Sequence, residues 1–203
     1  MTARFIDPAY LASGNDRQRA AHRALTELCI FDTLASYEPM LSGTIPLAID
    51  VAGSDLDVIC EVYDFDGFAV TLRSAYGHAP GFILSPFKHS REGPNLTASF
   101  SHGAFTIEVF GQALAVTRQS AYRHMMVQAR LLEVGGAALR CDIAALRRGG
   151  LKTEPAFAQR LSLAGDPYDA LLALEDLDED GLQRLLNNTA RKPCGQATIA
   201  AVD

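Results

Sequence analysis

The first half of the chain combines the hydrophobic period of a helix with that of strands. Residues 16–36 carry apolar side chains at helical spacing, which predicts a helix. Residues 57–63 form an apolar run typical of a strand. Residues 95–100 and 104–110 are two more runs of this kind, and the Ser-His-Gly sequence between them is typical of a hairpin turn. This half is therefore expected to form a small mixed β-sheet with flanking helices.

The second half of the chain, from residue 117 onward, has the period of helices. Two glycine pairs interrupt that period, Gly135-Gly136 and Gly149-Gly150. Helices are predicted over residues 117–133 and 137–148, from Thr153, from Asp166, and over residues 179–190. The expected fold class is α+β, with a mixed-sheet core at residues 1–116 and a helical C-terminal subdomain at residues 117–203.

Two segments connect the predicted strands of the first half. Residues 67–76 are predicted to form a helix capped by Asp66. Residues 77–94 are interrupted repeatedly by glycine and proline, which predicts a loop. This loop carries a basic cluster of Lys88, His89 and Arg91, which is either a solvated loop face or a contact for phosphate.

Composition and charge narrow the class of protein. The chain has 203 residues, 48% of them hydrophobic and 21% charged, which is typical of a soluble globular protein with one domain or one domain and an appendage. The net charge is −6 and there is no long basic run. Because proteins that bind duplex nucleic acid usually carry clustered Lys and Arg, no binding of a nucleic-acid duplex is expected.

The cysteines and the apolar runs indicate where the protein acts. Cys29, Cys60, Cys141 and Cys194 lie far apart, without the close pairs of a zinc site or the density of a disulfide scaffold. We therefore expect reduced thiols. No signal peptide begins the chain, and no apolar run is long enough to span a bilayer, so a cytoplasmic location and no membrane partner are expected.

The candidate chemistry lies between residues 42 and 57. Ser42-Gly43-Thr44 places glycine between two hydroxyl residues, which suits a tight turn where backbone N–H groups and hydroxyls converge on an anion. Asp55 and Asp57 are at positions i and i+2 of a predicted strand, so their carboxylates share one face. Such a pair beside a phosphate site is what a divalent metal holding a nucleotide requires. The alternative is an ordinary turn and strand beginning.

Glu108 adds a third carboxylate. It lies in the apolar run of residues 105–110, where a buried carboxylate without a partner would be costly. If this run neighbours the strand of Asp57, Glu108 completes a three-carboxylate cluster with Asp55 and Asp57. Three converging carboxylates repel one another unless cations lie between them, which favours a metal site.

These residues resemble a known signature. Gly43-Thr44, Asp55-x-Asp57 and the later strand residue Glu108 resemble the DNA polymerase β-type nucleotidyltransferase superfamily. Residues 42–46 followed by 53–57 resemble its GrpB-like branch. The chain is more similar still to a bacterial family catalogued only as a domain of unknown function, through residues 109–112, 121–125 and 150–155. Gly43-Thr44 departs from the usual Gly-Ser pair but keeps the hydroxyl.

The resemblance implies a metal-dependent nucleotidyltransferase that moves a nucleoside monophosphate from a nucleoside triphosphate to an acceptor hydroxyl. Two Mg²⁺ ions would be bound by Asp55, Asp57 and Glu108, with Glu108 also placed to act as a general base. Ser42, Gly43 and Thr44 would bind the β- and γ-phosphates. Arg123 and Lys152 are candidate cations for the triphosphate, with a surface role as the alternative.

Two other functions fit the same residues. One is a nucleotide-binding or regulatory module without catalysis. The presence of Glu108 disfavours it, because binding without chemistry does not need a third carboxylate. The other is a metal-dependent phosphohydrolase, in which water replaces the acceptor. The acceptor, the preferred base and the oligomeric state are not indicated by the sequence.

Overall fold

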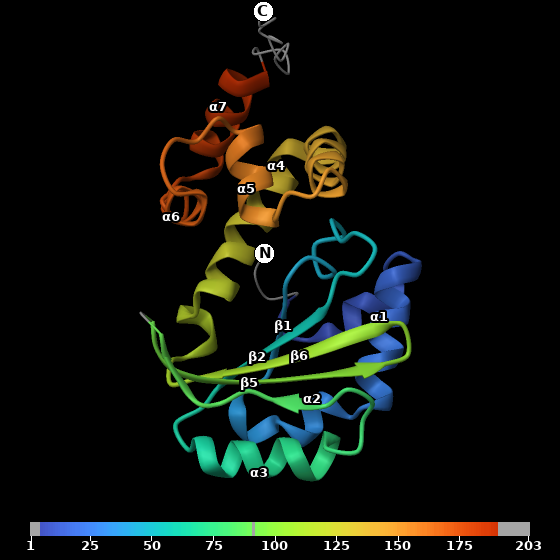
Figure 1. The fold of residues 1–203 in the computed structure, drawn as a ribbon. Helices are drawn as coiled ribbons and strands as arrows, with labels where there is room; N and C mark the ends of the chain where they lie inside the picture. Colours follow the sequence, from blue (N-terminus) through green and yellow to red (C-terminus); the bar gives the residue numbers. More distant parts are fainter. Residues whose placement is uncertain (1–4, 91, 191–203) are drawn as a thin grey trace, which may run out of the picture. The chain divides into compact units, whose positions relative to one another are not determined.

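The structure is a computed structural model that describes residues 5–90 and 92–190. It divides into two compact units, residues 1–129 and 130–203. The first unit contains a six-stranded mixed sheet with helices, and the second is helical. The predicted α+β fold class is thereby confirmed (Figure 1).

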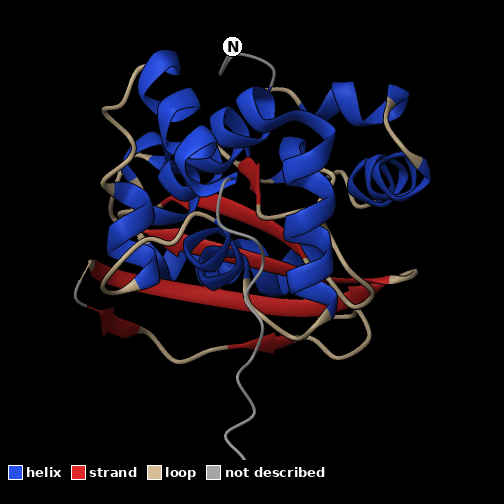
Figure 2. Ribbon diagram, turned by 90° about the horizontal axis from the view of Figure 1, so that it is seen from above, coloured by secondary structure: helices blue, strands red, loops and turns tan. Residues whose placement is uncertain are grey.

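The strands of the first unit form one sheet, drawn in red in Figure 2. Along the sheet the order is β1-β2-β6-β5-β3, and β4 also pairs with β5. Among the strands of the described residues, β2 and β6 pair in parallel and the other pairs are antiparallel. The strand bounds are Met40–Ser42 (β1), Leu56–Glu61 (β2), Ile83–Leu84 (β3), Lys88–Ser90 (β4), Gly93–His102 (β5) and Phe105–Gln112 (β6).

Helices cover one face of this sheet, and Figure 1 shows α2 and α3 on that side. The alternate residues Leu56, Val58 and Cys60 of β2 point into a single core with Ile107 and Val109 of β6. Helical residues that share this core include Leu25, Ile30, Phe68 and Leu72. The bounds are Pro8–Ser13 (η2), Asp16–Glu27 (α1), Ile30–Thr33 (α2), Ala35–Tyr37 (η3), Phe65–Tyr76 (α3) and Val116–Arg118 (η4).

The predicted helix of residues 16–36 is divided in the structure. Cys29 has a φ of 47°, so α1 ends at Glu27 and α2 begins at Ile30. A left-handed residue cannot continue a right-handed helix, and a non-glycine residue rarely adopts it. The break leaves Leu25 and Ile30 both buried in the core of the first unit.

The remaining helices are α4 (Ser120–Arg148), α5 (Thr153–Arg160), α6 (Pro167–Leu172) and α7 (Glu179–Ala190). Gly136 has φ 59° and ψ −152°, so α4 is interrupted at the predicted glycine pair. In the second unit, Arg130 donates to the carbonyls of Glu175 and Leu177. None of the helices in the described part of the chain combines the length and hydropathy that crossing a membrane requires.

The predicted loop of residues 77–94 contains two short strands, β3 and β4. Both pair with β5 at its free side. Both strands are only two or three residues long, and their pairing depends on the long strand beside them. Lys88 and His89 are exposed on β4. Arg91 of the basic cluster and Cys194 lie outside the described residues, and the cysteines Cys29, Cys60 and Cys141 are free thiols.

Candidate active site

Strand register places two of the candidate carboxylates, Asp57 and Glu108, on the face of the sheet opposite the main core, whereas Asp55 lies just before β2 and outside the register. Asp57 of β2 pairs with Glu108 of the parallel strand β6, and Ser42 of β1 pairs with Asp57. Directly paired residues point to the same face, and neighbouring strands lie about 4.8 Å apart. Since Val58 and Val109 point into the core, Asp57 and Glu108 point away from it.

Gly43 lies against the carboxylate of Asp57. A Cβ atom at residue 43 would lie 2.2 Å from Asp57 Oδ2 and 3.3 Å from its Cγ. Gly43 also has a φ of 85°, a conformation that residues with a Cβ rarely adopt. The turn that follows β1 is therefore shaped to leave room for the Asp57 carboxylate.

Negative charge is crowded around Glu108. Burial raises the pKa of its carboxyl, and the charge of Asp55 raises it further. Glu108 and Asp55 are nevertheless exposed at the surface of the described chain, and Asp57 is half-buried. The desolvation therefore comes from protein groups packed along part of the side chain, and the rest can be reached by a ligand.

The beginning of α4 covers part of the carboxylate face. Met40, Ile59 and Val116 form a small cluster on this face, with Phe110 and Tyr122 packed against it. Ser42 is buried, and its Oγ donates to the carbonyl of Ala121 at 3.3 Å. The hydroxyl of Ser42 is thus directed to the first turn of α4 in this structure.

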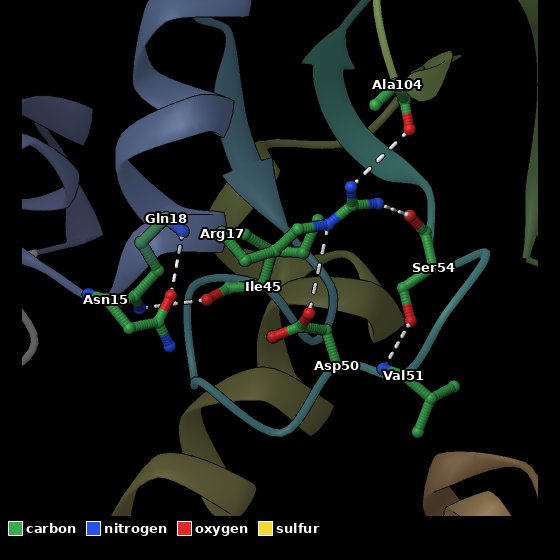
Figure 3. A network of polar contacts seen from close by, with 8 residues as sticks. All are labelled: Asn15, Arg17, Gln18, Ile45, Asp50, Val51, Ser54 and Ala104. Atoms are coloured by element: carbon green, nitrogen blue, oxygen red, sulfur yellow. Dashed lines mark hydrogen bonds and ion pairs between the residues drawn. The ribbon is translucent and has the colours of Figure 1, made fainter.

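The first turn of α1 holds the loop between β1 and β2. Asn15 and Gln18 form a capping box, in which each side chain accepts from the other's backbone N–H. The amide nitrogen of the buried Gln18 donates to the carbonyl of Ile45 at 3.0 Å (Figure 3). It also donates to the carbonyl of Pro46 at 3.3 Å. The side chain of Gln18 therefore both caps the N-terminus of α1 and holds the loop that follows Gly43 and Thr44.

Replacing Gln18 by alanine is expected to lower the free energy of unfolding by about 2 kcal/mol, because buried carbonyls lose their donor and the helix loses part of its cap. Urea unfolding followed by circular dichroism measures this change. Arg23→Ala, at an exposed position of the same helix, should stay within about 0.5 kcal/mol of the parent. Equal effects of the two substitutions would contradict the assigned role of Gln18.

The donor set of this face fits a hard divalent cation. Carboxylate oxygens are the ligands that Mg²⁺ prefers, and a cation would relieve the repulsion between Asp55 and Glu108. Across residues 5–90 and 92–190, however, no three His, Cys, Asp or Glu side chains are arranged so that they could hold a metal ion together. The two carboxylates paired across β2 and β6 are the part of the site that the fold itself brings together.

Three other site residues were predicted from the sequence, Thr44, Arg123 and Lys152. Thr44 is half-buried in the turn after β1. Arg123 is half-buried in α4 and engaged in an interaction, so it is not a free cation. Lys152 is exposed and precedes α5 in the second unit. Their roles toward phosphate stay predictions.

Two residues of this region were missed by the sequence analysis, Arg17 and Gln18. The start of the helix at residue 16 was predicted, and the capping-box spacing Asn15-x-x-Gln18 could also have marked Gln18. Nothing in the local sequence marks Arg17, because its partners Ser54 and Ala104 are distant in the chain.

The sequence of the chain matches one described family. The family model "Domain of unknown function (DUF4269)" matches residues 23–174, about three quarters of the chain. A comparison with curated proteins finds no match.

Solved structures give a likeness of fold. The chain is similar to Cid1, described as having RNA terminal uridylyl transferase activity, with 15% identity and a TM-score of 0.50 over 77% of this chain and 48% of that one. It is also similar to a cytoplasmic RNA terminal U-transferase, with 14% identity and a TM-score of 0.54 over 87% of this chain and 66% of that one. A third similar structure is that of the GLD-2/RNP-8 complex, with 11% identity and a TM-score of 0.50 over 93% of this chain and 82% of that one.

These likenesses define the fold and no more. The fold is similar to that of these terminal transferases, in line with the nucleotidyltransferase-like fold that the resemblance of the sequence implied. The chain spans about half the length of Cid1 and about two thirds of the terminal U-transferase. The activities and substrates of those longer proteins therefore do not transfer to this chain by the likeness alone.

Proposed function

This chain belongs to the family described as a domain of unknown function (DUF4269), and we propose that it is a metal-dependent nucleotidyltransferase. It would move a nucleoside monophosphate from a nucleoside triphosphate to an acceptor hydroxyl. The observation that carries the proposal is the pairing of Asp57 with Glu108 on an accessible sheet face, beside a turn whose Gly43 leaves room for Asp57. The nucleotidyltransferase fold supports the same function.

Asp57 and Glu108 would hold divalent metal, with Asp55 as a third ligand that joins them when metal is bound, and two Mg²⁺ ions are proposed. When bound, Mg²⁺ supplies charge neutralisation at the phosphates and at the developing alkoxide of the acceptor. Asp57 would be the central ligand, because it is paired on both sides, with Ser42 and with Glu108. Asp55 lies just before the first residue of β2 and would provide a further oxygen donor.

Glu108 accepts the proton of the acceptor hydroxyl at a carboxylate oxygen. Burial raises the pKa of its carboxyl, which favours proton acceptance over that of an ordinary carboxylate. The acceptor oxygen then forms a bond to the α-phosphorus while the bond between that phosphorus and the bridging oxygen to the β-phosphate breaks. Pyrophosphate leaves with the bonding electron pair, so atoms and charges balance.

The triphosphate is proposed to lie at the turn after β1. The backbone of Gly43, with φ 85°, and the hydroxyl of Thr44 would bind the β- and γ-phosphates. Ser42 would join them only if its hydroxyl leaves the carbonyl of Ala121. Arg123 and Lys152 are proposed as further cations toward the phosphates.

Transfer of the α-phosphate distinguishes this function from the two alternatives. ATP, GTP and UTP labelled at the α-phosphate would be incubated with the protein, Mg²⁺ and a single-stranded RNA oligonucleotide. RNA is the first acceptor to try, because two of the similar structures are described as RNA terminal transferases. A labelled acceptor and equimolar pyrophosphate support the proposal.

Other outcomes assign the alternatives. Labelled monophosphate with pyrophosphate and no labelled acceptor, for every acceptor tried, would assign a phosphohydrolase. Metal-dependent nucleotide binding with no turnover at all would assign a binding or regulatory module. In both cases Asp57→Asn tells whether the observed activity belongs to the paired carboxylates.

Several finer predictions accompany this proposal. We propose that the two functional parts of the chain meet between residues 116 and 117. We also propose that the chain is related to the GrpB-like branch and that the protein acts in the cytoplasm. The expectation that no nucleic-acid duplex is bound finds no support in the comparisons, since the similar structures include RNA transferases. The proposed acceptor is therefore a hydroxyl group, and the terminal hydroxyl of a single-stranded nucleic acid is one candidate.

A further inference from the structure

Arg17 connects the beginnings of the two parallel strands that carry the carboxylates. Its Nη2 donates to the carbonyl of Ser54 at 3.2 Å, and Ser54 directly precedes Asp55. Its Nη1 lies 3.5 Å from the carbonyl of Ala104, which directly precedes the first residue of β6. Figure 3 shows the guanidinium between these two carbonyls.

Two further contacts hold the guanidinium in place. Its Cζ lies 3.9 Å from the centre of the Phe105 ring, and Phe105 is itself buried in the main core. Its Nε lies 3.9 Å from Asp50 Oδ2, in the loop between β1 and β2. The side chain of Arg17 is 29% exposed, so these contacts are only partly screened by water.

The shape of arginine suits this position. The planar guanidinium presents several N–H donors in fixed directions, so one side chain can bind two carbonyls from different segments. β2 and β6 are parallel neighbours and begin at the same end of the sheet. Asp55 is one residue past Ser54, and Glu108 is four residues past Ala104.

We propose that Arg17 is a positioning residue, which holds the beginnings of β2 and β6 together and so sets the spacing between Asp55 and Glu108. Backbone pairing fixes Asp57 against Glu108, but Asp55 lies before the first residue of β2 and outside the ladder. Arg17 bonds to Ser54, the residue before Asp55, and to Ala104, the residue before β6, and so connects Asp55 to the beginning of β6. The consequence for metal binding rests on the proposed function.

The test uses Arg17→Ala, Arg17→Lys and the control Arg19→Ala in the full chain. Arg19 is an arginine of the same helix whose guanidinium bonds to Gly14 and Asp16, at the start of α1 and not at the sheet. Hydrogen exchange without metal is expected to become about tenfold faster in Arg17→Ala at residues 54–57 and 104–107, and unchanged there in Arg19→Ala.

Mn²⁺ affinity, measured by electron paramagnetic resonance without turnover, is the second readout. Because residues that orient metal ligands typically change metal affinity 10- to 100-fold, Arg17→Ala is expected to bind Mn²⁺ about tenfold more weakly than the parent. Arg17→Lys keeps a cation over Phe105 but lacks the fixed fork of donors, so it should fold normally and still bind Mn²⁺ more weakly. If Arg17→Ala does not fold, Arg17→Lys decides.

The outcomes separate this inference from the proposed function. Unchanged exchange at both strand beginnings, or parent-like Mn²⁺ affinity in a folded Arg17 variant, would overturn the positioning role while leaving the metal site intact. Faster local exchange in Arg17→Ala with no Mn²⁺ binding by the parent protein would support the positioning role and overturn the proposed metal site.

Discussion

Replacing Asp57 by asparagine is expected to abolish metal-dependent nucleotidyl transfer. Asp57 is the carboxylate that the sheet pairs on both sides, with Ser42 of β1 and Glu108 of β6. Asparagine has nearly the same shape but no negative charge, so the fold should survive while the affinity for Mg²⁺ falls. Metal-ion stabilisation is worth several kcal/mol, which predicts a loss in kcat of at least about 10³-fold.

The control for this substitution is Asp66→Asn. Asp66 is exposed in the first turn of α3, the helix that packs on the opposite face of the sheet. Initial rates with saturating nucleotide and Mg²⁺ measure both variants, and thermal unfolding shows that each is folded. A folded Asp57→Asn variant that keeps more than about a tenth of the parent rate would contradict a role for Asp57 in the chemical step.

Gly43→Ala is expected to damage the site more than the fold. The added Cβ would lie 2.2 Å from Asp57 Oδ2, and the end of a side chain can rotate away where backbone cannot. The carboxylate of Asp57 should therefore leave its position, with a loss of Mg²⁺-dependent nucleotide affinity of about tenfold or more. The positive φ of residue 43 adds a stability cost of about 1–2 kcal/mol.

Gly53→Ala separates these two effects. Gly53 has a similar φ of 83°, but an added Cβ there would meet nothing within 4 Å. Both variants should thus lose similar stability in urea unfolding, while only Gly43→Ala should lose nucleotide affinity. The same nucleotide affinity for both variants in calorimetric titration would contradict a role for the packing of Gly43 against Asp57 in nucleotide binding.

The strands that bear the carboxylates could be predicted from the sequence for a physical reason. Burial on one face only imposes a period of two on a strand, and β6 shows it, with Ile107 and Val109 buried on either side of the exposed Glu108. Asp57 lies between the buried residues Leu56 and Val58 in the same way. The common face of Asp57 and Glu108 follows from the register of two parallel strands, which the sequence alone does not contain.

Other features could not be predicted because their causes are distant in the chain. The break of the first helix at Cys29 has no glycine or proline to mark it. The strands β3 and β4 exist because β5 extends beside them and offers free hydrogen-bonding groups. The same holds for Arg17, whose contacts to Ser54 and Ala104 depend on where α1 packs.

Calorimetric titration of a non-hydrolysable nucleoside triphosphate, with Mg²⁺ and with EDTA, tests the central claim most directly. The claim is that the face of Asp57 and Glu108 binds a nucleotide through metal. The predicted result is binding in Mg²⁺ that is lost in EDTA and lost in Asp57→Asn, while Asp66→Asn binds like the parent. Equal affinity in Mg²⁺ and EDTA, or unchanged binding by Asp57→Asn, would contradict it.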